Sequence, residues 1–293
     1  MFMLAFCSMA AHAGMATLVL SDGSAPYHEA ADAIEAALGP QHTVTRMLAD
    51  KMPASASALS RANLLVAIGV KAADLVAGQG GSTPVLAVLV TEDWYRSQGK
   101  AKLSAGGRSV GVVVLEQPFS RQMDLVRKAF PQLSRIGVVL GRKNAGMLEP
   151  LQAAASKEGM TLVGAVSESE STLVATLEQV LREADLLLAV PDAEVLNRST
   201  VQSVLMTTYR YRDPMVGYSK ALSRAGALVS LYSTPVQIGR QAGEVAARVM
   251  SGARLPELQW PQYFSVSVNR HVARSLGSDV PSESALLAGL GGQ

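Results

Sequence analysis

The stretch that decides the fold is GALVSLYSTPVQIGRQAG at residues 226–243, followed by FSVSVNRHVARSLG at residues 264–277. It predicts an apolar strand, a helix punctuated by glycines, a second strand ending at Asn269 and a short helix. Ser233 and Thr234 before Pro235 are typical of a helix start, because a side-chain oxygen accepts from the first N–H groups and proline suits the first turn. The pattern alternates strands with helices and contains no catalytic signature.

Similar apolar runs recur upstream, separated by helical patterns. Most are continuous rather than alternating, which is typical of strands covered on both faces in a parallel sheet. The expected strands are 17–20, 64–68, 85–90, 110–115, 136–140, 161–166, 186–190, 215–218 and 227–231. Phe119, Met123, Val126 and Phe130 keep helical spacing, as do residues of the other connecting segments. The alternation predicts an α/β fold with doubly wound parallel sheets.

The number of strands is high for one sheet in a chain of 293 residues, so we expect two lobes. Pro-marked breaks predict that the chain crosses between them at Glu116–Pro118, at Ser233–Pro235 and near residues 260–263. The expected division has four parts. They are a signal peptide at 1–13, an N-terminal lobe of 14–117 and 234–260, a C-terminal lobe of 118–233 and 261–285, and a tail at 286–293.

Composition argues against several functions. With 26 basic and 24 acidic residues, the chain lacks the excess of positive charge that binding to a polyanion would need. We therefore expect no nucleic-acid partner. The four histidines are isolated and no cysteine pairs with them, which predicts no metal site. A nucleophile elbow, a P-loop and a dinucleotide fingerprint are all missing from the sequence. We therefore expect neither a cofactor nor enzymatic activity.

The N-terminal run carries no Lys or Arg before Ser21 and is mostly apolar. Ala11-His12-Ala13 forms a small-x-small site, so we expect a secretory signal cleaved after Ala13 and a periplasmic mature protein. Two other interpretations of this run stay open, a membrane span and lipid attachment at Cys7.

Ligands of open α/β sheets bind beyond the carboxyl ends of the strands, so we searched there for polar side chains. A helix cap or a turn is the alternative interpretation for Asp22, Asn144 and Asp192, because caps occupy the same positions. The candidate ligand-binding residues are Asp22, Gly69, Thr91, Glu92, Asn144, Asp192, Ser219 and Tyr232.

The C-terminal stretch, together with three strand-end and crossing motifs, resembles the solute-binding proteins of ABC transporters. These motifs are Asp192 after Leu-Ala-Val-Pro, Ser219 in Gly-Tyr-Ser, and the pair Gln117-Pro118. The resemblance is to the branch similar to tryptophan- and tyrosine-binding members, which have the type I periplasmic-binding-protein fold. It implies that strand ends of two lobes grip a ligand and that the lobes close by bending at three crossings. Gln117, Pro118 and Thr234 would then be hinge residues.

The same resemblance leaves the ligand open. The loops at 69–71 and 91–93 lack the Thr- or Ser-rich sequence with which amino-acid-binding members hold a ligand carboxylate. We expect a monomer that captures a small polar molecule and delivers it to an ABC permease in the inner membrane. The alternative is a two-lobed ligand sensor that reports to a signalling partner. A repressor is disfavoured because no helix-turn-helix precedes the first strand.

Overall fold

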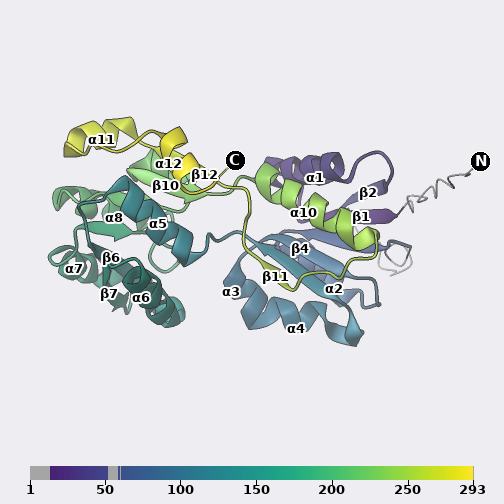
Figure 1. Ribbon diagram of the computed structural model, residues 1–293. Coiled ribbons are helices and arrows are strands. Elements are labelled where there is room, and N and C mark those ends of the chain that lie inside the picture. The colour runs from purple at the N-terminus through teal and green to yellow at the C-terminus, as the bar shows by residue number, and fades with distance from the viewer. Residues whose placement is uncertain (1–13, 52–58, 60, 293) are drawn as a thin grey trace, which may run out of the picture. The chain divides into compact units, whose positions relative to one another are not determined.

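The protein divides into two compact units. The computed structural model describes residues 14–51, 59 and 61–292, so the signal peptide expected at 1–13 lies outside the described residues. Unit 1 comprises the chain up to Leu115 together with Thr234–Pro261, and unit 2 comprises Glu116–Ser233 and Gln262–Gln293. The chain therefore passes between the units three times (Figure 1).

Unit 1 is built on a six-stranded sheet in the order β11-β5-β4-β3-β1-β2, and all its described pairings are parallel. Its strands are β1 (Met15–Leu20), β2 (Thr43–Leu48), β3 (Leu64–Ile68), β4 (Val85–Val90), β5 (Val110–Val114) and β11 (Leu258–Gln259). Its α-helices are α1 (Ala25–Leu38), α2 (Val70–Gly78), α3 (Glu92–Trp94), α4 (Lys100–Leu103) and α10 (Pro235–Met250). Short 3-10 turns at Ala49–Lys51 and Ala105–Gly107 and a π-helical turn at Tyr95–Gly99 complete the unit.

The strands of unit 1 are covered on both faces, as their continuous apolar runs predict. One face packs against α1 and α10, where Leu18, Val66 and Ile238 share a buried cluster. The other face packs against α2 and α4, where Ala67 and Leu103 belong to a second cluster. Figure 1 shows the two helical layers on opposite sides of this sheet.

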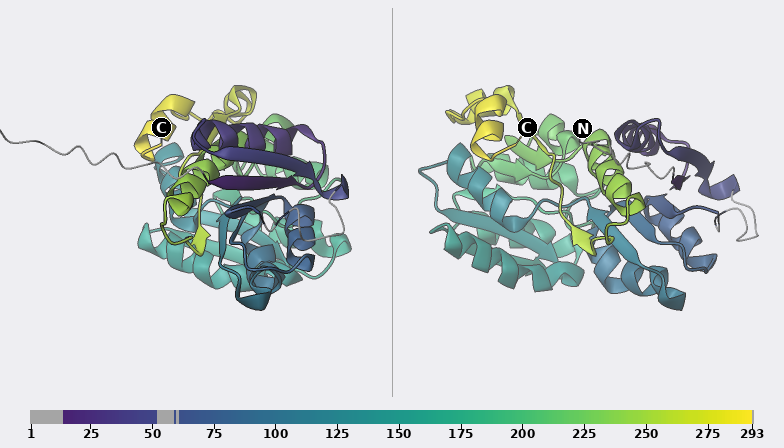
Figure 2. Two further views of the ribbon diagram at one scale, coloured as in Figure 1. Left: turned by 90° about the vertical axis from the view of Figure 1, so that its right-hand side faces the viewer. Right: turned by 45° about the vertical axis from the view of Figure 1, so that its right-hand side comes forward.

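Helix α10 returns to unit 1 by unusually close contact with α1, beside which it runs in Figures 1 and 2. A Cβ built on Gly239 would lie 2.4 Å from the carbonyl oxygen of Ala30, and one on Gly243 would lie 2.7 Å from that of Ile34. Both obstacles are backbone atoms, so they cannot rotate away. Glycine at these two positions is therefore what allows the helix backbones to approach.

Unit 2 has a six-stranded sheet in the order β12-β10-β9-β8-β6-β7. Its pairings are parallel except for the antiparallel pair of β10 and β12. Its strands are β6 (Arg135–Gly141), β7 (Thr161–Ser167), β8 (Leu186–Leu188), β9 (Met215–Gly217), β10 (Val229–Tyr232) and β12 (Ser265–Val268). Its α-helices are α5 (Phe119–Ala129), α6 (Leu148–Lys157), α7 (Glu170–Leu181), α8 (Val201–Arg210), α9 (Lys220–Ala225), α11 (Arg270–Leu276) and α12 (Glu283–Gly289), and a 3-10 segment, η5 (Arg142–Met147), precedes α6.

The sheet of unit 2 is likewise sandwiched between helices. Val138 and Leu140 of β6 join a buried cluster with residues of α5, α6 and α12. Val139, on the opposite face of the same strand, joins α7 and α8. The alternation along β6 is that of a strand with two apolar faces. The predicted fold class, two doubly wound parallel-sheet lobes joined by three crossings, is confirmed.

Several boundaries differ from the prediction. The expected tail at 286–293 is wrong, because α12 spans Glu283–Gly289 and Leu286, 1% exposed, belongs to the core of unit 2. Strand β2 was missed because it lies at the sheet edge and is partly exposed along its length. Gln117 falls in unit 2 rather than in unit 1, and Pro261 falls in unit 1.

None of the helices in the described ranges is both long enough and apolar enough to span a bilayer.

The close contact of α1 and α10 predicts opposite effects for two glycine-to-alanine changes in unit 1. Gly239→Ala should lower the free energy of unfolding by about 1–3 kcal/mol, because its Cβ overpacks against the backbone of α1. Gly78→Ala, at the end of α2 where a Cβ meets nothing within 4 Å, should be neutral or stabilising because alanine favours helices. Urea unfolding measures both, and equal effects would contradict the packing argument.

Candidate functional site

In unit 1 the predicted residues collect at one edge of the sheet. Asp22 follows β1, Gly69 follows β3, and Thr91 and Glu92 follow β4. Strand β3 pairs in parallel with both β1 and β4, so the carboxyl ends of the three strands lie at the same edge. The structure therefore brings the four candidates of this unit to the edge where open α/β sheets bind ligands.

The turn after β3 is shaped by its neighbour Ser21. The Ser21 hydroxyl donates to the carbonyl of Ile68 at 2.9 Å and accepts from the N–H of Ala72 at 3.0 Å, and the residue is buried. Gly69 has a φ of 92°, and a Cβ there would lie 2.4 Å from the Ser21 oxygen. Gly69 is thus a glycine for conformational and steric reasons, and only its backbone remains to meet a ligand.

The polar side chains of this edge already have partners. Asp22 accepts from the N–H of Ser24 at 2.8 Å. Hydrogen bonding from the Ser24 side chain, and then from its backbone N–H, holds the pKa of the Asp22 carboxyl below the ordinary value. This agrees with the turn interpretation of Asp22. Thr91 caps α3 by accepting from the N–H of Trp94 at 3.2 Å. Such caps leave the second lone pair of each oxygen available to a ligand donor.

Glu92 is held from two sides. One carboxylate oxygen accepts from Arg96 at 2.7 Å and the other from the indole N–H of Trp260 at 3.1 Å. Trp260 stays 42% exposed, although its ring is fixed by this bond. Sequence reasoning placed Trp260 at a crossing but not beside Glu92. No local signal links two residues so far apart in the chain.

In unit 2 the predicted residues also gather at the carboxyl ends of neighbouring strands. Asn144 follows β6, Asp192 follows β8, Ser219 follows β9, and Tyr232 ends β10. These four strands are adjacent and parallel, so their carboxyl ends share an edge.

Asp192 is the most deeply buried of these side chains, at 3% exposed. One carboxylate oxygen accepts from the N–H of Gly141 at 2.7 Å and the other from that of Glu194 at 2.8 Å. Asp192 therefore ties the loop after β8 to the end of β6. The interpretation of Asp192 as a helix cap near Val195 is wrong, because the next helix begins at Val201 and Asp192 instead closes a turn.

The remaining residues of this edge differ in how they are held. Ser219 caps α9 by accepting from the N–H of Leu222 at 3.1 Å. Asn144 lies half-buried within η5, and the cap position of α6 is Met147, so Asn144 does not cap that helix. Burial raises the pKa of the Tyr232 hydroxyl.

Tyr218 joins this edge and was not among the predicted site residues. Burial, and then the nearby charge of Asp192, raise the pKa of its hydroxyl. The signal in the sequence was a tyrosine closing an apolar run, immediately before Ser219. Tyr218 therefore places a phenol near Asp192 in unit 2.

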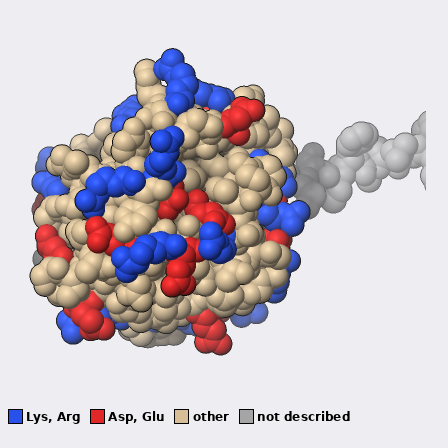
Figure 3. All heavy atoms as spheres, turned by 90° about the vertical axis from the view of Figure 1, so that its left-hand side faces the viewer, with Lys and Arg blue, Asp and Glu red and all other residues tan. Residues whose placement is uncertain are grey.

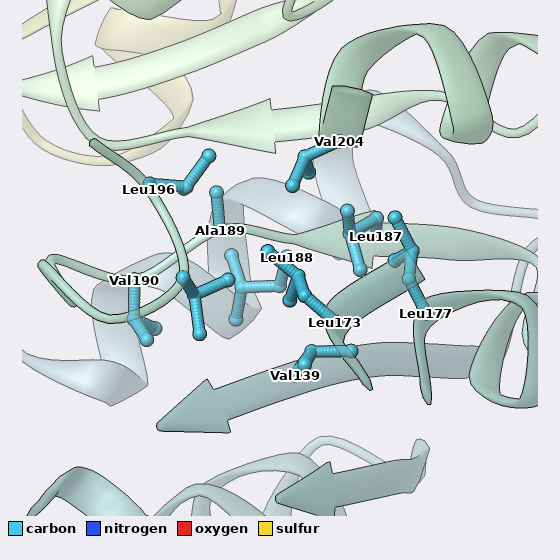
Figure 4. Close-up of a pocket in the computed structure, with 10 residues that line it drawn as sticks. Val139, Leu173, Leu177, Leu187, Leu188, Ala189, Val190, Leu196 and Val204 are labelled. Carbon is cyan, nitrogen blue, oxygen red and sulfur yellow. The ribbon is translucent and has the colours of Figure 1, made fainter. Parts of the chain in front are cut away.

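A hollow lies in each unit, and each adjoins the carboxyl end of a strand, β8 in unit 2 and β1 and β2 in unit 1. One lies in unit 2 and is lined only by aliphatic side chains, among them Val139, Leu173 and Leu187. Figure 4 shows these side chains pointing toward one another beneath the loop after β8. Since they belong to the buried cluster with α7 and α8, this pocket is a packing defect of the core rather than a site for a polar molecule.

A second hollow, of about 340 Å³, lies in unit 1 beside β2. Its lining includes His28, Arg46 and Lys51. Arg46 is neutralised by ion pairs to Asp32 at 2.7 Å and Glu35 at 2.5 Å, so the hollow has no clear preference for an anion. Among the residues that the structure describes, no group of histidine, cysteine or acidic side chains could hold a metal ion.

The most perturbed carboxyl of unit 2 lies at the opposite, amino-terminal edge of its sheet. Asp213 precedes β9, and one of its oxygens is buried without a hydrogen-bond partner in the described structure. Burial raises its pKa to about 6, the charge of Asp185 adds to the rise, and Arg135 opposes it. Arg135 is itself bound to Asp185, with Nη2 and the carboxylate oxygen 2.6 Å apart. Asp185, Arg135 and Asp213 therefore form a network of charges at this edge.

Charge on the outer face of unit 2 is mixed. Figure 3 shows acidic side chains near the middle of that face, with Lys and Arg around them. No extended basic patch is visible on this face, in keeping with the formal net charge of +2.

Comparison with known proteins points to one family. The sequence model of the family described as ABC transporter substrate binding protein matches residues 47–288, which is most of the chain. No curated protein gives a significant match.

Solved structures with the same fold have low sequence identity. A ligand-free, open substrate-binding protein with adhesive properties from Clostridium difficile is 17% identical, with a TM-score of 0.73 over 92% of this chain and 96% of that one. A protein from Streptococcus pneumonia in complex with L-Trp is 18% identical, with a TM-score of 0.59 over 94% and 98%. A conserved domain protein from Vibrio cholerae is 20% identical, with a TM-score of 0.59 over 94% and 97%. At these identities the similarity shows the fold alone.

The bonds of Asp192 predict a cost to stability that does not depend on any ligand. Asp192→Ala removes both acceptors and leaves the buried N–H of Gly141 unpaired, so the free energy of unfolding should fall by about 1–3 kcal/mol. Asp192→Asn keeps one carbonyl oxygen and should lose less. Urea unfolding measures both, with Asp22→Ala, which removes one exposed turn hydrogen bond, as a milder control. A loss no larger than that control would contradict the role of Asp192 in joining the two loops.

The raised pKa of Asp213 predicts a pH-dependent difference between wild type and Asp213→Asn. A carboxyl with a folded pKa of about 6 and an unfolded pKa of 3.8 binds its proton more tightly in the folded state. The protonated Asp213 carboxyl therefore contributes its full stabilisation of the fold below about pH 4. This stabilisation is lost as pH rises through about 6. Asp213→Asn should match wild type near pH 4 and be more stable by about 1 kcal/mol at pH 8, after discounting for partial exposure. Thermal midpoints across this range measure the effect, and a difference independent of pH would contradict it.

Proposed function

The chain belongs to the family of ABC transporter substrate-binding proteins, and on that premise we propose that it captures a small polar solute and delivers it to an ABC permease. The observation that carries the proposal is the architecture of the two units. Each has a mostly parallel sheet with polar side chains at its carboxyl edge, and three segments join the units. A binding protein of this kind needs no catalytic group, only convergent hydrogen-bonding residues.

We propose that strand-end residues of both units bind the solute. Thr91 and Glu92 would act from unit 1, and Asp192, Ser219 and Tyr232 from unit 2. The solute would bind between the two edges, and closing of the units would bury it. Only the closed form would then present both docking faces to a permease, so solute binding becomes a population shift toward the closed form.

Several features bear on the class of solute. Tyr218 and Tyr232 offer phenol groups in unit 2, and Trp260 offers a fixed ring in unit 1. A similar fold from Streptococcus pneumonia has L-Trp bound. We propose a solute of about that size with both polar groups and an apolar body. The proposal includes a periplasmic location, following the expected signal at 1–13, a monomeric state and no enzymatic activity.

The first test is native mass spectrometry of protein purified from its own host. A retained small molecule, released on denaturation, is the expected result and identifies the solute. Protein that carries nothing, and gains no thermal stability from a panel of amino acids, sugars and polyols, would overturn solute capture.

A matched pair of serines then tests the assigned residues with the retained solute. Ser219 and Ser282 each cap a helix of unit 2, and each accepts from a backbone N–H at 3.1 Å. Both alanine variants should lose about 1 kcal/mol of stability as caps. Only Ser219→Ala should also weaken binding, by roughly ten- to a hundredfold, if its hydroxyl contacts the solute. Isothermal titration measures the affinities, and equal affinities would remove Ser219 from the site.

A further inference from the structure

Strand β4 carries an irregularity just before it reaches the candidate site. Val88 and Val90 of this strand face consecutive residues of β5, so Leu89 between them is an extra residue. Leu89 has a φ of 53°. Leu89 and Arg212 are the residues other than glycine with positive φ in the part of the chain that the structure describes. An extra residue of this kind is a β-bulge, and bulges are common beside functional sites, where they redirect a side chain.

The bulge reverses the alternation of side chains along β4. Ahead of it, Leu86 and Val88 face the buried cluster with α1 and α10, whereas Ala87 faces the cluster with α2 and α4. A regular strand would turn Val90 to the same side as Val88, because side chains alternate with a period of two. Val90 instead joins the cluster of Ala87, and Leu89 packs against the other cluster. The extra residue therefore turns the end of β4 over.

The hydrogen bonds of β4 show the same reversal. The carbonyl of Val88 accepts from the N–H of Gly69, which follows β3, at 2.8 Å. The carbonyl of Val90 accepts from the N–H of Leu115, which follows β5, at 3.0 Å. Two residues that are two apart in a regular strand bond to the same neighbouring strand. Everything after the bulge, beginning with the site residues, is thus displaced by one position and turned over.

The turn that carries Glu92 is fixed to the rest of unit 1. Trp94 is buried in the cluster with α2 and α4. The hydroxyl of Tyr95 donates to the carbonyl of Glu257, just before β11, at 3.2 Å. With this base held in place, the way β4 ends sets the direction in which Glu92 points. In that direction its carboxylate accepts from the indole N–H of Trp260 at 3.1 Å.

Leu89 adopts its conformation against its own preference. Leucine is disfavoured at positive φ because its Cβ comes close to the following carbonyl oxygen. Glycine adopts the same conformation at no steric cost. Strained residues persist where the surrounding structure imposes the strain, and they gather at binding and catalytic sites. Leu89 lies beside such a candidate site, at the carboxyl end of β4.

We propose that the bulge at Leu89 positions Glu92 against Trp260 and so shapes the surface that unit 1 presents to the solute. Leu89 is then a positioning residue that acts through Glu92. A regular strand would turn Glu92 to the other side and leave the half-exposed indole without this acceptor. This role rests on the proposed function, in which Glu92 contacts the solute.

Fluorine NMR of protein labelled with 5-fluorotryptophan tests the positioning without a solute. The chain has two tryptophans, so two resonances are expected, and Trp260→Phe assigns them. Glu92→Ala removes the acceptor of the indole and gives the shift of the Trp260 resonance that a lost contact produces. Leu89→Ile keeps the volume of the side chain, but a β-branched residue is strongly disfavoured at positive φ. It should move the Trp260 resonance in the same direction as Glu92→Ala does.

Two further variants separate backbone conformation from packing. Leu89→Gly loses the side chain but adopts positive φ freely, so it should keep the Trp260 resonance of the wild type. Leu86→Ile makes the same chemical change in a regular, fully buried part of β4, so it should also leave the resonance in place. An unmoved resonance in Leu89→Ile would overturn the proposal. So would a shift in Leu86→Ile or Leu89→Gly as large as that in Leu89→Ile.

If Leu89→Ile does not fold, the stabilities of Leu89→Gly and Leu89→Ala decide. Glycine inside a strand is ordinarily less stable than alanine, but the order reverses where φ is positive. The glycine variant should therefore have the higher midpoint in urea, and the opposite order would overturn the proposal. No solute is added in any of these measurements. A protein that gives the expected responses but carries no solute would reject solute capture and leave the positioning of Glu92 intact.

Discussion

The contact between α1 and α10 is the constraint on which the rest of the architecture depends. Without side chains at Gly239 and Gly243, the backbone of α10 packs directly on that of α1. This contact draws the chain back to unit 1 after the second crossing. It thereby places β11 at the edge of the sheet of unit 1 and makes a third crossing necessary before β12. The number of connecting segments thus follows from helix packing within unit 1.

At the carboxyl edges of the two sheets, residues that we propose to bind a solute also make structural hydrogen bonds. Thr91 and Ser219 cap helices, and Asp192 ties two loops together. Each such bond fixes the side chain and leaves further acceptor capacity on the same oxygen. A residue positioned by the backbone in this way loses little conformational freedom when a ligand binds. Structural and binding roles therefore need not exclude each other here.

Much of the fold could be predicted from the sequence because its strands are buried on both faces. Runs such as 64–68 and 85–90 are continuous and apolar, and they form β3 and β4 with the predicted bounds. Edge strands lack that signal, so β2 and the two-residue β11 were missed. The helix around Leu286 was missed because its apolar residues follow Pro281 closely and resemble a loose terminus.

The candidate residues could be placed at strand ends, but their partners could not. Which N–H groups meet Asp192 depends on how β8 lies beside β6, since Gly141 is distant in sequence. The same holds for Trp260 against Glu92 and for Ser233 between Gln117 and Tyr263. These contacts form only when segments from separate parts of the chain meet. One sequence does not show which distant residues pair, whereas the cap at Thr234 is local and was expected.

The interleaving of the two units also governs when they can form during synthesis. A nascent chain that ends at Ser233 has the sheet of unit 1 except β11, but it lacks α10. The face of α1 with Ala30, Ile34 and Leu38 would then have no covering helix. Unit 2 is likewise incomplete until β12, which pairs with β10, and α12, which joins its core, have been synthesised. Neither unit can be completed until almost the whole polypeptide has left the ribosome.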